Sequence, residues 1–141
     1  MKEDMAMAKT AIEEVQEFLK SAQTYYLATI DGNRPRVRPF GTAEIFEGKL
    51  YIQTGKKKDV FKQIEKNPEV ELCAFKDGRW LRVAGRLVHD DRREPEEDML
   101  DKNPGLKKMY AAGDGNTTVL YFEKAEATFS SFTEPPRTVV F

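Results

Sequence analysis

Short segments rich in β-branched and aromatic residues alternate with tight-turn residues along most of this sequence. The turn residues are Asp31-Gly32-Asn33, Glu47-Gly48 and Asp77-Gly78. Glycine with asparagine or aspartate between such segments is typical of short β-hairpin loops, because these residues tolerate positive φ angles. The alternation predicts about seven short antiparallel strands. A chain with so many strands and few helices is expected to form a closed or partly closed barrel.

The first strands are expected to form a three-stranded meander. The extended run Pro35–Ile45 is predicted to pair with Leu50–Thr54 through a two-residue turn at Glu47-Gly48. Counting back from that turn brings Arg38 opposite Lys57 near the end of the ladder. The later strands are predicted at Val70–Phe75, Trp80–His89, Thr118–Phe122 and Ala127–Phe132.

Three polar stretches have the pattern of short helices. Thr10 and Glu13 form a capping-box signature in front of an apolar stripe. A second helix from Asp59 is expected to stop at Asn67-Pro68, because proline disfavours helix in the residue before it. The stretch Asp90–Asp114 is helix-prone, and its apolar positions are Leu106, Met109 and Tyr110. The prediction is a mainly β single domain, residues 1–141, with short flanking helices.

The composition argues against several classes of function. The 141 residues carry 23 basic and 24 acidic side chains, and this near balance argues against a dedicated nucleic-acid binder. No apolar run approaches the roughly 20 residues that cross a bilayer. Cys73 is the single cysteine, and the N-terminal residues do not resemble a signal peptide. The protein is therefore expected in the reducing cytoplasm, away from membranes.

The C-terminal segment Glu134–Phe141 combines two prolines with an apolar end. Such a segment suits docking on a neighbouring molecule more than a free end. Trp80, Phe129 and Phe132 add apolar surface beyond what so small a core can cover. A two-fold homodimer is therefore expected.

Basic and strand-end residues are predicted to converge on the start of the second helix. They are Arg36, Arg38, Thr54, Gly55, Lys56, Lys57 and Lys58. A helix N-terminus carries partial positive charge and free N–H groups, so this locus suits a phosphate dianion. The alternative is that the lysines are solvated and that the two arginines only protect a sheet edge.

Four segments match a known family in their order and spacing. They are Asn33-Arg34-Pro35-Arg36-Val37-Arg38-Pro39-Phe40, Leu50-Tyr51-Ile52-Gln53-Thr54-Gly55 with Lys58, Glu71-Leu72-Cys73-Ala74-Phe75, and Trp80-Leu81-Arg82-Val83-Ala84-Gly85. On these motifs the chain resembles the pyridoxamine-phosphate oxidase-like flavoproteins, closest to the short general-stress and nitroimidazole-resistance members. The resemblance implies an FMN-binding split β-barrel of six to seven antiparallel strands.

The same resemblance implies a set of contacts to flavin mononucleotide (FMN). Arg38, Thr54 and Lys58 would hold its phosphate, with Gly55 and Lys57 beside them at the basic locus. The residues expected along the ribityl chain and the ring are Arg36, Val37, Pro39, Phe40 and Gln53. Trp80 would lie near the same flavin, from its own or the second subunit; the alternative is that it packs in the core.

The function implied by the resemblance is a flavin-dependent oxidoreductase acting on a small molecule. The chain lacks the C-terminal arginine and histidine segment that grips pyridoxal in the true oxidase, so vitamin B6 oxidation is not expected. The alternative is a binding module that holds FMN or another flat cofactor without turnover, as a carrier or stress-response protein. With one histidine, His89, and one cysteine, the sequence predicts neither a catalytic dyad of these types nor a Cys/His metal cluster.

Overall fold

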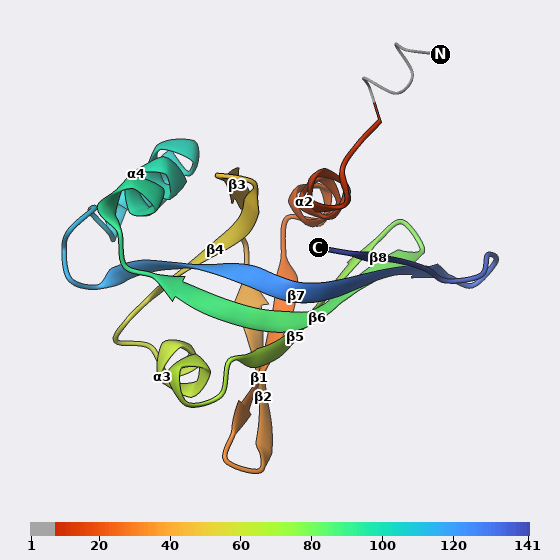
Figure 1. Cartoon of the computed structure of the whole chain (residues 1–141), viewed down its shortest axis with the longest axis horizontal. Helices are drawn as coiled ribbons and strands as arrows, with labels where there is room; N and C mark the ends of the chain where they lie inside the picture. The colour runs from red at the N-terminus through yellow and green to blue at the C-terminus, as the bar shows by residue number, and fades with distance from the viewer. Residues whose placement is uncertain (1–7) are drawn as a thin grey trace.

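The computed structural model describes residues 8–141, which form one antiparallel sheet of eight strands with short helices beside it (Figure 1). The strands are β1 (Tyr25–Asp31), β2 (Arg34–Phe40), β3 (Glu44–Phe46), β4 (Lys49–Gly55), β5 (Glu69–Lys76), β6 (Arg79–Asp90), β7 (Thr117–Ser131) and β8 (Arg137–Val140). The helices of this described part are α2 (Ala11–Ala22), α3 (Asp59–Lys66), α4 (Arg93–Lys102) and the 3₁₀ helix η1 (Pro104–Lys108). The expected mainly β split-barrel fold is confirmed, with eight strands in place of six or seven.

The sheet is open, and its opening lies between two strands that follow each other in the chain. The strand order is β2-β1-β5-β6-β7-β4-β3, and β8 pairs with β7. β2 and β3 therefore lie at opposite ends of the order, although only residues 41–43 separate them. In Figure 1 the long strands β6 and β7 cross the middle of the molecule, with the β1–β2 hairpin below them and α2 and α4 above.

The expected meander is wrong, and with it the pairing of Arg38 with Lys57. The run Pro35–Ile45 is interrupted after Phe40, and Arg38 lies opposite Leu27 of β1. The turn at Glu47-Gly48 is where the sequence predicts it, but it joins β3 to β4. β4 pairs with β3 along one edge and with β7 along the other. Side-chain bonds replace the ladder at the interruption, since the Thr42 hydroxyl accepts the N–H of Gln53 at 2.9 Å.

β7 is one strand of 15 residues where the sequence predicts two, Thr118–Phe122 and Ala127–Phe132. Lys124, in the predicted gap, has a φ of 52°. The pairing of β6 with β7 shifts register between Ala84 and Arg86. A Cβ on Gly85 would lie 3.1 Å from the Cα of Ala125, so the strands approach closely there. The polar residues in the gap therefore bend the strand at a bulge and do not end it.

The helices largely follow the sequence prediction. In the capping box at the start of α2, Glu13 N–H donates to the Thr10 hydroxyl and Thr10 N–H donates to the Glu13 carboxylate, both at 3.2 Å. The second helix, α3, ends before Asn67-Pro68 as expected. The third stretch, Asp90–Asp114, differs from the prediction in its buried positions. Met99 and Leu100 of α4 are buried, whereas Met109, one of the expected apolar positions, is 70% exposed.

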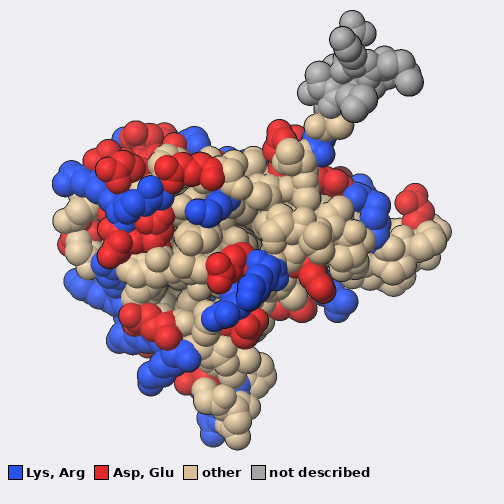
Figure 2. All heavy atoms as spheres, in the orientation of Figure 1, with Lys and Arg blue, Asp and Glu red and all other residues tan. Residues whose placement is uncertain are grey.

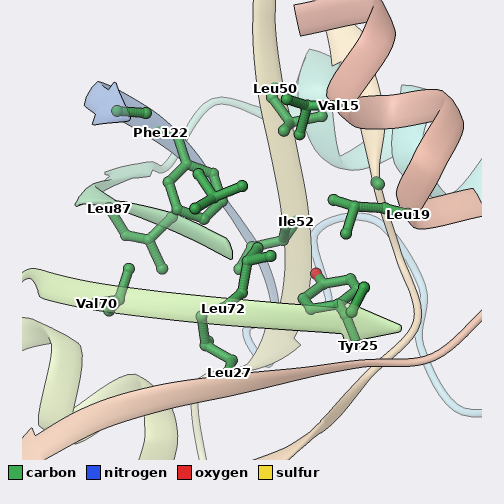
Figure 3. Close-up of a cluster of buried hydrophobic side chains, with 14 of the residues drawn as sticks. Val15, Leu19, Tyr25, Leu27, Leu50, Ile52, Val70, Leu72, Leu87 and Phe122 are labelled. Atoms are coloured by element: carbon green, nitrogen blue, oxygen red, sulfur yellow. The ribbon is translucent and has the colours of Figure 1, made fainter. Parts of the chain in front are cut away.

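The hydrophobic core lies between α2 and the inner face of the sheet (Figure 3). Val15 and Leu19 of α2 face Leu27, Ile52 and Leu72, which come from three different strands and are fully buried. Burying one side chain of this size stabilises the fold by about 1.5–3 kcal/mol. The core thereby holds β1 and β4 in place beside the opening of the sheet.

The C-terminal segment, which the sequence predicts to dock on a neighbouring molecule, pairs with β7 of its own chain. Arg137–Val140 pairs with β7, and Phe141 exchanges two backbone hydrogen bonds with Ala125. Val139 and Phe141 pack against the core, whereas Val140 is 67% exposed. Alternation along a strand explains this difference between neighbours.

Positive and negative side chains are interspersed on the face drawn in Figure 2, as the near balance of charge in the sequence suggests. Within residues 8–141, no helix is long and apolar enough to cross a membrane.

Candidate functional site

A cleft with a volume of about 440 Å³ lies at the opening of the sheet. Its lining residues are Arg38, Pro39 and Phe40 of β2, Gly41 and Thr42 of the interruption, Gln53 and Thr54 of β4, Lys58 and Val60 at the start of α3, and Asn103, Gly105 and Leu106 between α4 and the middle of η1. Because β2 and β4 do not pair with each other, side chains can line a cavity between them. The break in the sheet therefore creates the cleft.

The structure brings six of the eleven expected site residues together in this cleft. They are Arg38, Pro39, Phe40, Gln53, Thr54 and Lys58. The other five, Arg36, Val37, Gly55, Lys57 and Trp80, do not line it. β2, β4 and the start of α3 thus meet as the sequence predicts. The predicted pairing of Arg38 with Lys57, however, is wrong, because Arg38 lies opposite Leu27.

Two residues outside the lining have structural roles near the cleft. Gly55 ends β4 in a crowded place, where a Cβ would lie 3.1 Å from Oδ1 of Asn116 and 3.2 Å from the hydroxyl oxygen of Tyr110. The N–H of Lys57 donates to the same Asn116 oxygen at 3.2 Å, while the lysine side chain is exposed. Both residues therefore pack the loop before β7 closely against the end of β4.

The remaining three lie further from the cleft. Arg36 forms a solvent-exposed ion pair with Asp31 at 3.4 Å. Val37 is 67% exposed on β2. Trp80 is half-buried on β6, with its ring centroid 5.1 Å from that of Phe132, so it is neither a core residue nor part of the cleft of its own chain.

Arg38 lies at the junction of β2, β1 and α3. Its guanidinium donates through Nη1 to the Thr29 hydroxyl at 2.7 Å and to the Leu27 carbonyl at 3.2 Å, and through Nη2 to Oε1 of Gln63 at 2.6 Å. Burial, followed by repulsion from Arg36, lowers the pKa of Arg38, and Asp59 acts in the opposite direction. Within residues 8–141, no carboxylate forms a salt bridge with Arg38. The guanidinium is held rigidly, and its charge is offset only in part, by Asp59, which forms no salt bridge with it.

The start of α3 adds further donors to the same part of the cleft. Lys58 is the N-cap residue, and its side chain makes no capping bond. The first N–H groups of an α-helix have no partner inside the helix and carry partial positive charge. Lys58, like Arg38, has no salt-bridge partner in the described part of the chain. Two cationic side chains therefore meet at a helix N-terminus, and Asp59, the first residue of α3, forms a salt bridge with neither of them.

The β4 side of the cleft is a buried polar wall. Thr42, Gln53 and Thr54 are each less than one-tenth exposed. The Gln53 amide donates to the Thr54 carbonyl at 3.1 Å and to the Thr117 hydroxyl at 3.2 Å. These bonds fix the side chain of Gln53, because both hydrogens of its amide nitrogen are used.

The sequence did not predict the wall formed by Asn103, Gly105 and Leu106. Of these three residues the sequence marks only Leu106, as an apolar position of a helix-prone stretch. The triplet Asn103-Pro104-Gly105 signals a turn, but a turn signal does not say where a loop lies in the fold. This wall depends on the packing of α4 beside β3.

The single histidine and the single cysteine of the chain do not line the cleft. His89 is exposed near the end of β6 with its ring against Phe61. Cys73 is half-buried on β5, and burial raises the pKa of its thiol. Within the described residues, no group of three or more His, Cys, Asp or Glu residues is arranged to hold a metal ion.

Known structures resemble this fold at several levels of sequence identity. A NimC/NimA family protein from Clostridium acetobutylicum is 44% identical over 92% of both chains, with a TM-score of 0.90. General Stress Protein 26 from Bacillus anthracis is 16% identical, with 92% of this chain and 98% of that chain covered and a TM-score of 0.73. A heme binding protein from Mycobacterium smegmatis is 12% identical, with coverage of 95% and 59% and the same TM-score of 0.73. The last two likenesses concern the fold alone.

Family comparison covers almost the whole described chain. No curated protein sequence matches it. The family model described as pyridoxamine 5'-phosphate oxidase matches residues 11–137, from the start of α2 into β8. The match includes every element that lines the cleft. The chain therefore belongs to the pyridoxamine 5'-phosphate oxidase family.

Proposed function

We propose that the cleft binds FMN and that the protein is a flavin-dependent oxidoreductase acting on a small molecule. The observation that carries this proposal is that Arg38 and Lys58, neither of them in a salt bridge within residues 8–141, lie beside the N-terminus of α3. A phosphate dianion suits such a place, because it accepts charge-assisted bonds from both side chains and from helix N–H groups. Membership of the family supports a flavin as the molecule that carries the phosphate.

The lining of the cleft fits the other parts of FMN. A volume of about 440 Å³ is within the range of about 300–1,000 Å³ of small-molecule sites. Phe40 and Leu106 offer apolar surface for a flat ring. Thr54 offers a hydroxyl to the phosphate, and its neighbour Gln53 suits the ribityl chain. The residues present are therefore compatible with a phosphate, a polyol chain and an aromatic ring.

Bound FMN would supply hydride or electron transfer to a small acceptor. The roles of the chain are then to bind and orient: Arg38 and Lys58 hold the phosphate, and Phe40 excludes water from the ring. None of the described lining residues is Asp, Glu, His, Cys or Tyr. Of the side-chain types that usually act as acid or base, the described lining contains only lysine, as Lys58, which is assigned here to the phosphate.

With Lys58 assigned to the phosphate, the described lining keeps no further acid or base, and this favours a second candidate, a module that holds a flavin without turnover. The two candidates differ in kinetics. An oxidoreductase should have its flavin reduced by a nicotinamide nucleotide and reoxidised by an acceptor at a catalytic rate, on the order of 1 per second or faster. A carrier should bind FMN equally well and show only slow exchange of electrons.

The visible absorption spectrum of the purified protein tests the central proposal. We expect a yellow protein, or one that becomes yellow and quenches flavin fluorescence when FMN is added. A colourless protein that leaves the fluorescence of added FMN unchanged would overturn it.

We also propose that two copies form a dimer that covers the cleft. Pro39, Gly41, Lys58 and Gly105 remain exposed along the cleft, so one chain leaves it open to solvent. Tyr26 and Phe75 are 53% and 63% exposed on neighbouring strands β1 and β5. Apolar side chains gathered on a sheet face are typical of an interaction surface. A partner docked there could bring its Trp80 toward the flavin.

A cytoplasmic location is proposed from the lone thiol. Cys73 has no second cysteine in the chain to pair with, which suits a reducing compartment. Cell fractionation with the tagged protein tests this, and recovery outside the cytoplasm would contradict it.

A further inference from the structure

Asn103, on the wall of the cleft that the sequence did not predict, has an amide whose orientation the surroundings determine. Its Nδ2 donates to Oε2 of Glu44 at 3.0 Å and to the carbonyl of Met99 at 3.0 Å. Both partners are acceptors, so the nitrogen and not the oxygen must face them. Among residues 8–141, none donates a hydrogen bond to the remaining atom, Oδ1. Asn103 therefore has one free acceptor and no free donor on its side chain.

Glu44 anchors this amide. The carboxylate is buried, with its side chain 4% exposed, and Oε2 also accepts a charged bond from Lys20 of α2 at 2.7 Å. Gln16 of the same helix reaches Oε1 at 3.4 Å. Oε2 of Glu44 thus faces the Lys20 ammonium and the Asn103 amide nitrogen, and a carboxylate oxygen can only accept from them. The network thus links α2, β3 and the end of α4, and it forbids the reversed orientation of the amide.

The free oxygen belongs to the end of the cleft away from the basic residues. Glu44 pairs with Tyr51, three residues before Thr54 on β4. A rise of about 3.3 Å per residue separates these positions by about 10 Å along the strand. Thr42 lies between the two ends, since its hydroxyl accepts the N–H of Gln53, the residue before Thr54, and keeps its own hydrogen available. The acceptor of Asn103 is therefore available where the ring of a flavin would lie if its phosphate is at Arg38, with the Thr42 hydroxyl as a donor nearer the phosphate.

We propose that Asn103 is a flavin-binding residue whose Oδ1 accepts the ring N–H of the isoalloxazine, with Glu44 as its positioning residue. This inference rests on the proposed FMN site. The oxidised ring carries a single N–H, N3–H, between two carbonyl groups, so a fixed acceptor attracts that position and repels its neighbours. The Thr42 hydroxyl suits one of the adjacent carbonyls. Because the amide cannot flip to present its nitrogen in place of Oδ1, the contact would be selective for a hydrogen-bond donor on the ring.

FMN and N3-methylated FMN, which lacks that N–H, are the probes that test the assignment. The wild type is expected to bind FMN at least about tenfold more tightly than the methylated form in fluorescence titrations. Asn103→Ala should weaken FMN binding by about three- to tenfold, the usual worth of one hydrogen bond, and should reduce the preference for FMN to below about threefold. Asn33→Ala, in an exposed turn, is the control and should leave both affinities unchanged.

Two further variants keep the test decisive. Asn103→Ser, whose side chain is too short to reach the ligand, repeats the measurement if Asn103→Ala is unstable. Glu44→Gln should lower the preference for FMN, whereas an equal loss for both flavins would show that Glu44 acts only on stability. An unchanged preference in a folded Asn103 variant overturns the assignment while leaving the FMN site intact. A wild type that binds neither flavin overturns the FMN proposal and this inference together.

Discussion

Arg38 combines a rigid position with a charge that only Asp59 offsets in part, without a salt bridge, and this combination explains how a single residue can favour a phosphate. Its three bonds go to neutral acceptors on β1 and α3. Burial lowers its pKa because the charged form loses hydration, and Arg36 adds repulsion. A bound dianion would relieve both effects. Binding is therefore expected to stabilise the folded protein as well as to fill the cleft.

Arg38→Ala should weaken FMN binding by roughly 1.5–3 kcal/mol, or about one to two decades in affinity, because a charge-assisted contact is lost. Lys58→Ala should have a similar but smaller effect. Both losses should be much smaller for riboflavin, which lacks the phosphate. Titration with the two flavins measures the difference, with Lys62→Ala on the exposed side of α3 as the control. Equal losses for riboflavin and FMN would mean that Arg38 does not contact the phosphate.

Asp90 shows the opposite arrangement, a nearly buried carboxylate with its charge fully compensated. Its oxygens accept Nε of Arg92 at 3.0 Å, Nη2 of Arg92 at 2.8 Å and the Tyr51 hydroxyl at 2.8 Å. These bonds, those from Arg92 most of all, lower the pKa of Asp90 from 3.8 to about 2. The cluster ties the end of β6 to β4 and to the start of α4.

Asp90→Asn should lower the free energy of unfolding by about 2 kcal/mol at pH 7, which is the order of magnitude that the lowered pKa represents. Because the folded pKa lies below the unfolded one, this stabilisation is complete above about pH 4. It is lost as the pH falls toward 2. Urea unfolding of both proteins at several pH values measures it, with Asp91→Asn, an exposed neighbour, as the control. A difference that stays constant from pH 7 to pH 2 would contradict this account.

At the scale of elements, the interruption between β2 and β3 and the added strand β8 shape the sheet. The interruption separates two halves of one extended run, so that β2 stays with β1 while β3 and β4 join β7. β8 pairs with β7 on the same edge as β4, further along the strand, and Arg137 pairs there with Glu14 of α2. The interruption creates the cleft, and β8 covers part of the core.

Neighbouring residues of β8 provide a matched test of this packing. Val139→Asp should destabilise the protein by about 1–3 kcal/mol, because the side chain packs against the core. Val140→Asp should change stability by less than about 0.5 kcal/mol, since Val140 is 67% exposed. Thermal and urea unfolding of the two variants measures the difference. Equal effects would show that β8 does not pair with β7 in this register.

At the scale of the whole molecule, an open sheet with an uncovered apolar face leaves the cleft incomplete. Ligand sites usually bury about 70–90% of a small molecule, whereas several lining residues here remain exposed. A second copy placed on the face that carries Tyr26 and Phe75 would supply the missing wall. Dimer formation and FMN affinity should therefore be linked.

Tyr26→Asp should shift a dimeric wild type toward monomer and weaken FMN binding by at least about tenfold, because a charge would be buried at the interface. Light scattering and flavin titration on the same samples measure both effects. Met109→Asp changes an equally apolar and 70% exposed side chain outside this face, so it should affect neither. A monomeric wild type with tightly bound FMN would contradict the dimer.

The sequence by itself determined the local features: the hairpin turns, the capping box of α2, the end of α3 at Asn67-Pro68, and the cleft residues carried by the β2 and β4 motifs. Each of these depends on residues close together in the chain. Only the tertiary structure decided that the run through Gly41 breaks, that Arg38 lies opposite Leu27, and that Asn103 lines the cleft. Strand partners and distant walls result from competition among all the edges and faces of the fold, which no short stretch of sequence encodes.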